Sequence, residues 1–596
     1  MSDKKSTWVA GIARGHNSGV CLLKDGELVF ATEEERFSRQ KYDGGPLASM
    51  LKIKEYTDKI DYLVIAHTTE LGSAGKIDYS PDDVYTALAR KVGLIEPHIG
   101  LNHPQVVDLA FMHHKLHAAC AFYRSGFEDA VAVVVDGAGT FVPISYGDSH
   151  LTFFETESII DCSYPADFRT VWKHLGARDP IVSSYVPDFD SSYYAEDGYT
   201  HECVFSDTCG ITKVYEAVTE YCGFPAIEAG KTMGLFPYGE KNDKIPEFFR
   251  PTAYGDRANR DLFIPNYPQG AFVNQNVFEF INDIPESDDL TKEQNRRDMA
   301  YACQKATQEQ VLKVIRMAVE KTGKKQVVLS GGYGLNCVAN YYYLEELKDE
   351  GIELFVEPVS NDAGTAIGAA MMFWHGIEDD MTVRPLKDLY HGPRYNYTDS
   401  DISSVVEKYG VEISDANNEN VVALMKEKNI VSLFQGSSEA GPRALGNRSI
   451  LFDPTFEDGK DFVNMIKRRE YFRPFAGSIL AEHVHDWFDL RGMEDSPYMM
   501  YAVKCQPGIA EKIPSIIHVD GTCRIQTVTP EQNEHYHSLI SEFYKQTGVP
   551  IVFNTSFNLG GEPLVETLDD AVRTLVNSDI EYLFLPEYGK LITVKN

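Results

Sequence analysis

Residues 111–140 limit the fold of this chain more than any other stretch of its sequence. They begin with a predicted helix in which His113 and His117 are four residues apart, so both imidazoles project from one face. The almost purely apolar residues 130–135 then predict a buried strand. This strand ends at Asp136, followed by glycines, which is where α/β folds bind ligands. The stretch therefore predicts an α/β protein with a ligand site at this strand end.

The side chains at this strand end suit a metal ion. Two neutral imidazoles and a carboxylate are ligands for a first-row divalent metal such as Fe(II), Mn(II) or Zn(II). A second carboxylate, Asp362, follows another predicted strand, residues 353–357. The predicted ligand set is therefore His113, His117, Asp136 and Asp362. Two alternatives remain open: the histidine spacing could arise by chance among 17 histidines, and Asp362 could instead cap the helix that follows it.

The chain repeats one plan of strands and turns. Residues 8–13, 20–23 and 28–32 predict three strands, with a glycine-rich turn that contains His16 between the first two. Residues 130–154 repeat this order, with a glycine-rich turn in the same place. The duplication is similar to that of the actin, sugar-kinase and heat-shock-chaperone (ASKHA) superfamily, whose paired hairpins hold nucleotide phosphates between two lobes. Two unrelated hairpins are the alternative.

Other parts of the first two thirds are less regular. Residues 155–225 are rich in aromatic residues, Ser, Asp and Cys with weak periodicity, which predicts an irregular insertion, a lid or a binding region. Residues 298–322 have the periodicity of a helix, and residues 326–329 predict a buried strand that leads into Gly331 and Gly332. Glycines at such a place let backbone N–H groups approach a phosphate or an adenosine.

Length and charge bound the function. A chain of 596 residues should form at least two domains, and residues 376–400, which lose periodicity, predict the linker between them. The formal net charge of −33 repels phosphate backbones, so a broad nucleic-acid-coating surface is not expected. The ten cysteines form no C-x-x-C pair, and no apolar run reaches membrane-spanning length. With no signal-peptide core at the N-terminus, we expect a soluble, cytoplasmic protein without a membrane partner.

Positive charge is concentrated in loops of the last third of this acidic chain. Its residues lie beside glycine turns and predicted strand ends, where guanidinium groups and backbone amides suit phosphates. They are Arg443, Arg448, Lys467, Arg468, Arg469, Arg473 and Arg524. A solvated basic face is the alternative, and it explains Arg468 or Arg469 better than a set spread over several loops. We therefore expect a pocket for an anionic substrate.

Taken together, the motifs of the chain resemble those of the NodU/CmcH-type O-carbamoyltransferases, which include antibiotic-tailoring enzymes. The resemblance runs through nearly the whole chain. It rests on EEERFSR from Glu33, the histidine motif from His113, AGKTMGLFPYG from Ala229, LSGGYGLN from Leu329, NDAGTAIGAA from Asn361, GPRALGNRSIL from Gly441, KRREYFRPFAGSIL from Lys467, HVDGTCRIQTV from His518 and NTSFNLGGEP from Asn554.

The resemblance implies two catalytic domains. Residues 1–380 would form an ASKHA-like domain, similar to the tRNA threonylcarbamoyl-transferring enzymes, that transfers a carbamoyl group with an Fe(II)-type metal. Residues 400–596 would form a YrdC-like α/β domain that makes carbamoyl-adenylate from carbamoyl phosphate and Mg-ATP. The resemblance assigns catalytic roles to His16, Arg443, Lys467 and Arg473. It assigns cofactor binding to Lys231, Gly331, Gly332, Asn336, Arg448, His518, Arg524, Asn554 and Ser556.

The acceptor is not identified by any residue. The leading hypothesis is an acceptor hydroxyl on a small metabolite or on a hydroxymethylated pyrimidine, with DNA disfavoured by the net charge. Carbamoyl transfer to a protein thiol or a tRNA-type base is one alternative, and a non-catalytic nucleotide-binding module is another. A homodimer is the default expectation for the oligomeric state.

Overall fold

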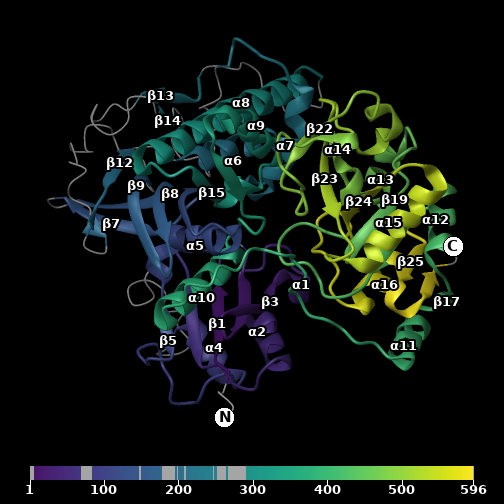
Figure 1. Cartoon of the computed structure of the whole chain (residues 1–596), viewed down its shortest axis with the longest axis horizontal. Helices are drawn as coiled ribbons and strands as arrows, with labels where there is room; N and C mark the ends of the chain where they lie inside the picture. The colour runs from purple at the N-terminus through teal and green to yellow at the C-terminus, as the bar shows by residue number, and fades with distance from the viewer. Residues whose placement is uncertain are drawn as a thin grey trace. The chain divides into compact units, whose positions relative to one another are not determined.

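The computed structural model describes residues 6–15, 17–68, 83–146, 149–177, 195–196, 199–206, 210–245, 247–251, 263–265 and 290–594. The chain divides into two compact units (Figure 1). The first consists of Met1–Gly15, Gly19–Glu27 and Ile53–Leu386. The second consists mainly of Leu28–Lys52 and Lys387–Asn596. The division near residue 386 falls within the predicted linker, whereas the inclusion of Leu28–Lys52 in the second unit was not predicted.

The first sheet of unit 1 is built around β1 (Trp8–Ala13), whose apolar residues are almost entirely buried. The strand β2 (Gly19–Lys24) pairs with β1 in the antiparallel direction. On the other side, β4 (Tyr62–Ala66) pairs with β1 and β5 (Val106–Asp108) pairs with β4, both in parallel. A buried, largely apolar central strand is what a parallel arrangement covered on both faces requires.

The second sheet repeats this arrangement around β6 (Asp129–Val135). The long strand β8 (Ser149–Ser163) is antiparallel to β6, while β15 (Gln326–Ser330) and β16 (Glu353–Val356) follow on the other side in parallel. Beyond β8 the sheet continues with β9 (Asp167–Ala177) and β12 (Glu202–Ser206). Both sheets thus place an antiparallel strand on one side of the central strand and two parallel strands on the other. This duplication confirms the predicted α/β fold of the actin and sugar-kinase type.

Two predictions about this region were wrong in detail. The predicted third strand, residues 151–154, is part of β8, and among the described strands β7 (Phe141–Tyr146) pairs with β8 alone, at the side of the sheet. Residues 155–225 are not an irregular insertion where the structure describes them, because they contain the rest of β8, all of β9 and the helix α6 (Ile211–Tyr221). Charged side chains are buried in these strands, which removes the usual alternation of apolar and polar residues.

Two helices form the centre of unit 1. The helix α5 (His113–Ser125) packs on the second sheet, α10 (Ala363–Glu378) packs on the first, and the two helices contact each other. Figure 1 shows α10, in green, beside the purple strand β1. Their close approach depends on glycine, because a Cβ atom at Gly368 would lie 1.9 Å from the carbonyl oxygen of Leu116.

This contact predicts opposite effects for two glycines of the same helix. Gly368→Ala should destabilise the protein by about 3 kcal/mol, because the neighbouring atom belongs to a helix backbone that cannot move away alone. At Gly376 the nearest atom to an added Cβ is 3.4 Å away, so Gly376→Ala should stabilise α10 by roughly 0.5 kcal/mol. Urea unfolding of both variants measures the difference. Equal midpoints would contradict the packing of α5 against α10.

The second unit is organised around one mixed sheet. Its order is β17-β26-β25-β18-β19-β24-β20-β23-β22-β21, with parallel pairs only at β18–β25 and β20–β23 among the pairings described. The strands are β17 (Glu412–Asp415), β18 (Val431–Phe434), β19 (Arg448–Phe452), β20 (Ala476–Leu480), β21 (Phe488–Asp489), β22 (Ala502–Cys505), β23 (Thr522–Val528), β24 (Ile551–Ser556), β25 (Tyr582–Leu585) and β26 (Lys590–Thr593).

Helices α12 (Asn418–Lys426) and α15 (Glu534–Thr547) contact each other, and α15 packs on β20 and β24. The remaining helices of this unit are α1 (Glu35–Ser38), α2 (Leu47–Lys52), α11 (Asp399–Tyr409), α13 (Gly459–Ile466), α14 (Val484–Trp487) and α16 (Leu568–Val576). In unit 1 the others are α4 (Val84–Lys91), α7 (Ala229–Leu235), α8 (Leu290–Thr322) and α9 (Cys337–Leu347).

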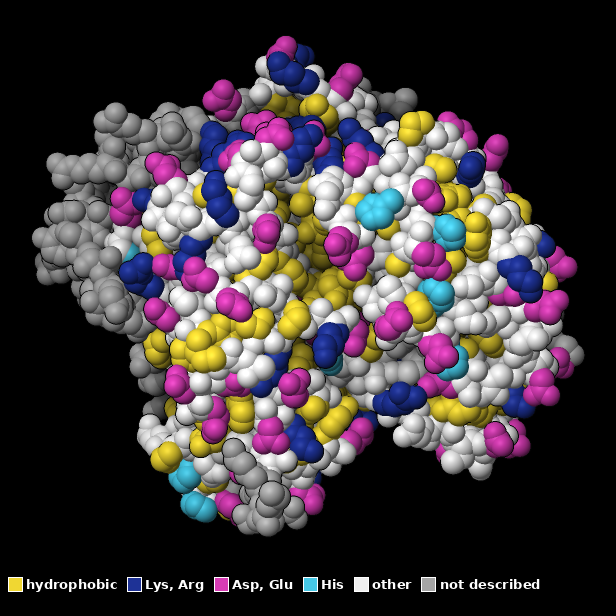
Figure 2. All heavy atoms as spheres, viewed as in Figure 1, with side chains coloured by type: hydrophobic (Ala, Val, Ile, Leu, Met, Phe, Trp, Pro, Cys, Tyr) yellow, Lys and Arg dark blue, Asp and Glu magenta, His cyan; other side chains and the backbone are white. Residues whose placement is uncertain are grey.

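The surface agrees with the composition. On the face drawn in Figure 2, acidic side chains are spread over the described surface with basic ones among them, as the net charge of −33 requires. Among the described residues, no helix is both long enough and apolar enough to cross a membrane.

Candidate functional site

The structure brings the four predicted metal ligands together inside unit 1. The Nε2 atoms of His113 and His117 are 3.2 Å apart. Nε2 of His113 is 3.5 Å from an oxygen of Asp136 and 3.7 Å from an oxygen of Asp362. One ligand atom of each residue lies within 4.8 Å of all the others, and all four side chains are buried. Ligands bonded to one first-row metal at about 2.1 Å lie roughly 3 to 3.5 Å apart, so the cluster needs little adjustment to hold an ion.

The charges of the cluster also fit a cation. Burial acts to lower the pKa of His113, but Asp136 and Asp362 outweigh it and raise this pKa to about 9. Burial and the neighbouring His113 lower the pKa of His117 to about 3. Burial alone would raise the pKa of Asp136, yet the histidines hold it well below its ordinary value, so the carboxylate stays ionised. The two carboxylates thus favour a positive charge at His113, and a metal cation bound between the side chains would take the place of that proton.

Asp136 is held by the glycine turn that follows β15. The backbone N–H of Gly332 donates to Oδ1 of Asp136 at 3.0 Å, which leaves Oδ2 directed toward His113. Gly331 has φ +87°, and a Cβ there would lie 2.4 Å from the carbonyl oxygen of Val135. Glycine is therefore required for this turn to reach the end of β6. The observed contact of Gly332 is with a ligand carboxylate, and its predicted contact with an adenylate is not tested.

Asp362 occupies the N-cap position of α10, but its side chain makes no capping hydrogen bond. The alternative role of helix cap is therefore not observed, and the carboxylate instead lies 3.9 Å from Nε2 of His117. On its other side, a Cβ at Gly15 would come within 2.7 Å of Oδ2 of Asp362, so the first glycine-rich turn lies against this ligand. His16, the predicted catalytic residue of that turn, lies outside the described residues.

A buried ion pair beside the ligands was not predicted. Glu155 on β8 pairs with Lys173 on β9 at 2.6 Å, and its Oε2 accepts the backbone N–H of Thr140 at 2.9 Å. The hydroxyl of Thr140 in turn accepts the backbone N–H of His113 at 3.1 Å. Glu155 thus fixes both the turn after β6 and the start of α5. No sequence signal marked it, because the strand that carries it has no recognisable alternation.

His67 was also not predicted from the sequence as a residue of the site, although its position after a buried strand could have indicated it. It follows the buried strand β4, and strand ends in this fold carry ligands. Burial, followed by Arg14 and His113, lowers the pKa of His67 to about 4, which places a neutral imidazole close to the ligand cluster.

Two other predicted residues of unit 1 have local contacts. Lys231 on α7 pairs with Glu228 at 2.7 Å and lies over the ring of Phe224. Asn336 caps α9, where its Oδ1 accepts the N–H of Ala339 at 3.1 Å, and its amide contacts Gln304. These contacts position the two side chains within the fold, and nucleotide binding by them remains a prediction.

In unit 2, the loop that carries Arg443 wraps around a buried carboxylate. Oε1 of Glu439 accepts the backbone N–H groups of Leu445 at 2.8 Å and Asn447 at 2.9 Å. In the sequence, the half-buried Arg443 follows Glu439 and precedes Leu445 and Asn447, so it belongs to the segment that these hydrogen bonds close. The loop is therefore held at its centre rather than by strand pairing.

The structure also gathers the predicted cations of unit 2. Burial lowers the pKa of Arg469 well below its ordinary value, and the positive charges of Arg473 and Arg524 lower it further. Burial, followed by Arg469 and Arg473, likewise lowers the pKa of Lys467. The set Lys467, Arg469, Arg473 and Arg524, here called the cationic cluster, thus consists of like charges that raise one another's free energy. An anion is the natural partner for such a cluster.

Lys467 is tied to the loop after β24. Its buried Nζ donates to the carbonyl oxygens of Ser556 and Asn558, the latter at 2.9 Å, and to Oδ1 of Asn558 at 3.2 Å. Three oxygen acceptors match the three protons of an ammonium group. The hydroxyl of Ser556 donates to Oδ1 of Asn558 at 2.6 Å, which completes the arrangement.

Three further predicted residues have structural contacts. Arg448 is buried over the ring of Phe434, and its guanidinium donates to the carbonyl oxygen of Gln435 at 2.6 Å. The amide of Asn554 donates to the hydroxyl of Ser478 at 2.9 Å. His518 is buried, and its backbone N–H donates to Thr522 at 2.8 Å. These contacts account for the side chains of Arg448 and Asn554 within the fold and give no support to their predicted role in cofactor binding.

Comparisons with known proteins agree with the motifs. A family model described as carbamoyltransferase N-terminus matches residues 101–371, and one described as carbamoyltransferase C-terminus matches residues 422–590. The first covers all four predicted metal ligands, and the second covers the cationic cluster.

Two nodulation proteins are similar to most of the chain. NolNO of Sinorhizobium fredii is 29% identical over 96% of this chain and 78% of that protein. NolO of Bradyrhizobium diazoefficiens is 30% identical over 79% of this chain and 77% of that protein. Among solved structures, full-length HypF in a phosphate- and nucleotide-bound form matches 62% of this chain and 56% of that chain, with 12% identity and a TM-score of 0.37, too low to carry an argument.

Proposed function

The chain belongs to the carbamoyltransferase family, and from this premise we propose that it is an ATP-dependent O-carbamoyltransferase with two separate active sites. Unit 2 would form carbamoyl-adenylate from carbamoyl phosphate and ATP. Unit 1 would transfer the carbamoyl group to an acceptor hydroxyl. The observation that carries this proposal is that each unit has its own cluster, one of imidazoles and carboxylates in unit 1 and one of cations in unit 2.

In the first step, water releases phosphate from carbamoyl phosphate and leaves carbamate. A carbamate oxygen then bonds to the α-phosphorus of ATP as the bond to the β-phosphate oxygen breaks, and pyrophosphate leaves. The two substrates bring several negative charges close together, and their repulsion must be neutralised. The cationic cluster supports this step, because its positive charges lie close enough to lower one another's pKa, one of them is buried, and their sign is opposite to that of the phosphates.

In the second step, the acceptor oxygen bonds to the carbamoyl carbon, the bond to AMP breaks, and the hydroxyl proton passes to a base. His113, His117, Asp136 and Asp362 would hold an Fe(II)-type ion. When bound, such an ion supplies a Lewis acid for an oxygen of the adenylate. Gly332 and Glu155 support the step by fixing Asp136 and the start of α5. His16 remains the proposed base.

The test is carbamoyl-phosphate-dependent exchange of labelled pyrophosphate into ATP by the purified full-length protein. We expect exchange in the absence of any acceptor, because the reaction of carbamate with ATP to give carbamoyl-adenylate and pyrophosphate is reversible and would need unit 2 alone. No exchange would eliminate the proposal and would leave a non-catalytic nucleotide-binding module as the alternative.

The same purified protein can be used to determine the class of acceptor. A small hydroxyl compound is favoured over hydroxymethylated DNA, because the net charge of −33, with acidic side chains spread over the face shown in Figure 2, would repel a phosphate backbone. Screening both classes for carbamoyl transfer decides between them. Transfer to a protein thiol or tRNA-type base is the remaining alternative.

A further inference from the structure

The segment Leu28–Lys52 belongs to unit 2, although the chain returns to unit 1 at Ile53. It contains the EEERFSR motif of residues 33–39, to which the proposed chemistry assigns no role. Two arginines of this motif make contacts with loops more than 400 residues away along the chain. Those loops are the ones that carry or hold the cations of the proposed adenylation site.

Arg36 contacts the loop of Arg443. Its buried guanidinium donates from Nη2 to the carbonyl oxygen of Gly441 at 2.8 Å and to that of Glu439 at 3.2 Å. Glu439 is the residue whose carboxylate holds the backbone amides of this loop, and Gly441 lies two residues before Arg443. Arg36 thus fixes the loop at the residues that lead directly into Arg443.

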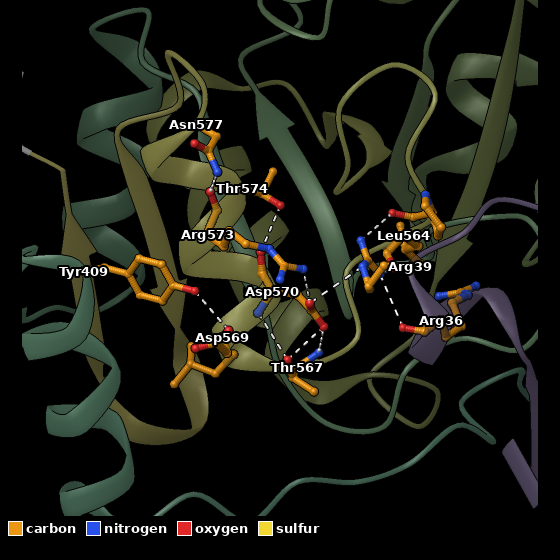
Figure 3. Close-up of polar contacts among 12 residues, drawn as sticks. Arg36, Arg39, Tyr409, Leu564, Thr567, Asp569, Asp570, Arg573, Thr574 and Asn577 are labelled. Atoms are coloured by element: carbon orange, nitrogen blue, oxygen red, sulfur yellow. Dashed lines mark hydrogen bonds and ion pairs between the residues drawn. The ribbon is translucent and has the colours of Figure 1, made fainter. Parts of the chain in front are cut away.

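Arg39 contacts the loop between Ser556 and Glu566. Nη1 donates to the carbonyl oxygen of Leu564 at 2.5 Å, and Nη2 donates to that of Pro563 at 2.9 Å. Figure 3 shows the guanidinium between Leu564 and the carboxylate of Asp570, which is 3.6 Å from Nε. Arg39 itself has φ +60°, a left-handed conformation at the end of α1 that directs the chain into this contact.

Arg39 and Lys467 therefore hold opposite ends of one loop. Lys467 binds the carbonyl oxygens at Ser556 and Asn558, and the N–H of Gly560 donates to the carbonyl oxygen of Lys467 at 2.8 Å. The charge of Lys41, just beyond the motif, adds to those of Arg469 and Arg473 around Lys467. Like charges placed this close push their loops apart unless backbone contacts oppose the repulsion.

We infer that Arg36 and Arg39 are positioning residues of the anionic-substrate site in unit 2, which they assemble by holding the Arg443 loop and the 556–566 loop through backbone carbonyl oxygens. The inference rests on the proposed function, since it assigns these loops to the binding of carbamoyl phosphate and ATP. The N-terminal segment is then part of the adenylation site, and a fragment that begins at residue 400 lacks two of its supports.

The experiment compares Arg39→Ala with Arg573→Ala in the full-length protein. Both arginines contact Asp570, with Nη2 of Arg573 at 2.5 Å, and both changes remove one positive charge (Figure 3). Of these two arginines, only Arg39 has a described contact with the 556–566 loop. Arg39→Ala should raise the KM for carbamoyl phosphate in pyrophosphate exchange at least about tenfold with a smaller change in kcat, whereas Arg573→Ala should leave both within about twofold.

A second readout does not depend on activity. Hydrogen exchange at the amides of Gly560 and Val565, which bond to Lys467 and Phe557, should be about tenfold faster in Arg39→Ala than in Arg573→Ala at equal thermal midpoints. Arg39→Lys should recover part of the loss, because an ammonium group can still reach one carbonyl oxygen. Faster exchange with an unchanged KM, or equal KM values in the two alanine variants, would overturn the inference. Absence of pyrophosphate exchange in the wild type would instead overturn the proposed function.

Discussion

Replacing His117 by alanine should weaken metal binding in unit 1 at least about 100-fold and leave pyrophosphate exchange within about twofold of the wild type. The change removes one of the two imidazoles whose Nε2 atoms face each other at 3.2 Å, and alanine offers no donor in its place. We expect the dissociation constant for Co(II), used as a spectroscopic probe, to rise at least 100-fold, or about 2.7 kcal/mol. Carbamoyl transfer to an acceptor should fall with it. Visible absorbance during Co(II) titration measures the binding.

His114 provides the matched control. It is buried beside His113, but its Nδ1 contacts the hydroxyl of Ser158 at 2.7 Å and it is not among the four clustered ligands. His114→Asn should keep Co(II) affinity within about fivefold, because asparagine can retain a hydrogen bond to Ser158. Equal loss in both variants would show that the effect comes from packing of α5 and would remove the support for a metal site.

The four residues of the buried His/Asp cluster could be predicted because each has a local signal. Helical spacing places His113 and His117 on one face, and the ends of two buried strands carry Asp136 and Asp362. The duplicated fold then brings strand ends together, as the sheets of unit 1 show. The supports of these ligands have no such signal. Glu155 is a buried carboxylate paired with Lys173 on the neighbouring strand, and no local pattern identifies that partner.

Contacts between segments far apart in the sequence could not be predicted either, because no local pattern identifies the partner. Nothing in EEERFSR indicates that Arg39 binds the carbonyl oxygen of Leu564, since a carbonyl oxygen is common to all residues. Likewise the basic loops predicted an anion site, but not that Arg448 would be buried against the carbonyl oxygen of Gln435. Residue type predicted where positive charge would gather, but it could not tell which arginines are buried against backbone carbonyl oxygens, because that depends on how the backbone folds.

Replacing Lys467 by methionine should reduce pyrophosphate exchange about 100- to 1000-fold while Co(II) binding in unit 1 is unchanged. Methionine fills a similar volume but leaves the carbonyl oxygens of Ser556 and Asn558 without their donor, and it removes a buried charge from the cationic cluster. Lys545→Met is the control, since it makes the same change at an exposed position. Exchange should stay within about twofold there. A comparable loss in both variants would mean that net charge, not the cluster, sets the rate.

The same residue predicts the pH dependence of exchange. Burial, with Arg469 and Arg473, lowers the pKa of Lys467 well below its ordinary value, so its ammonium is lost at a lower pH than that of an exposed lysine. Exchange should be fully present below this lowered pKa and should decline as pH rises through it. Bound phosphates favour the charged form, so the decline in kcat should occur at higher pH than the decline in kcat/KM. Lys467→Arg, which keeps its charge at high pH, should lack this alkaline decline, and pH profiles of both proteins measure it. An identical decline in the arginine variant would assign it to another group.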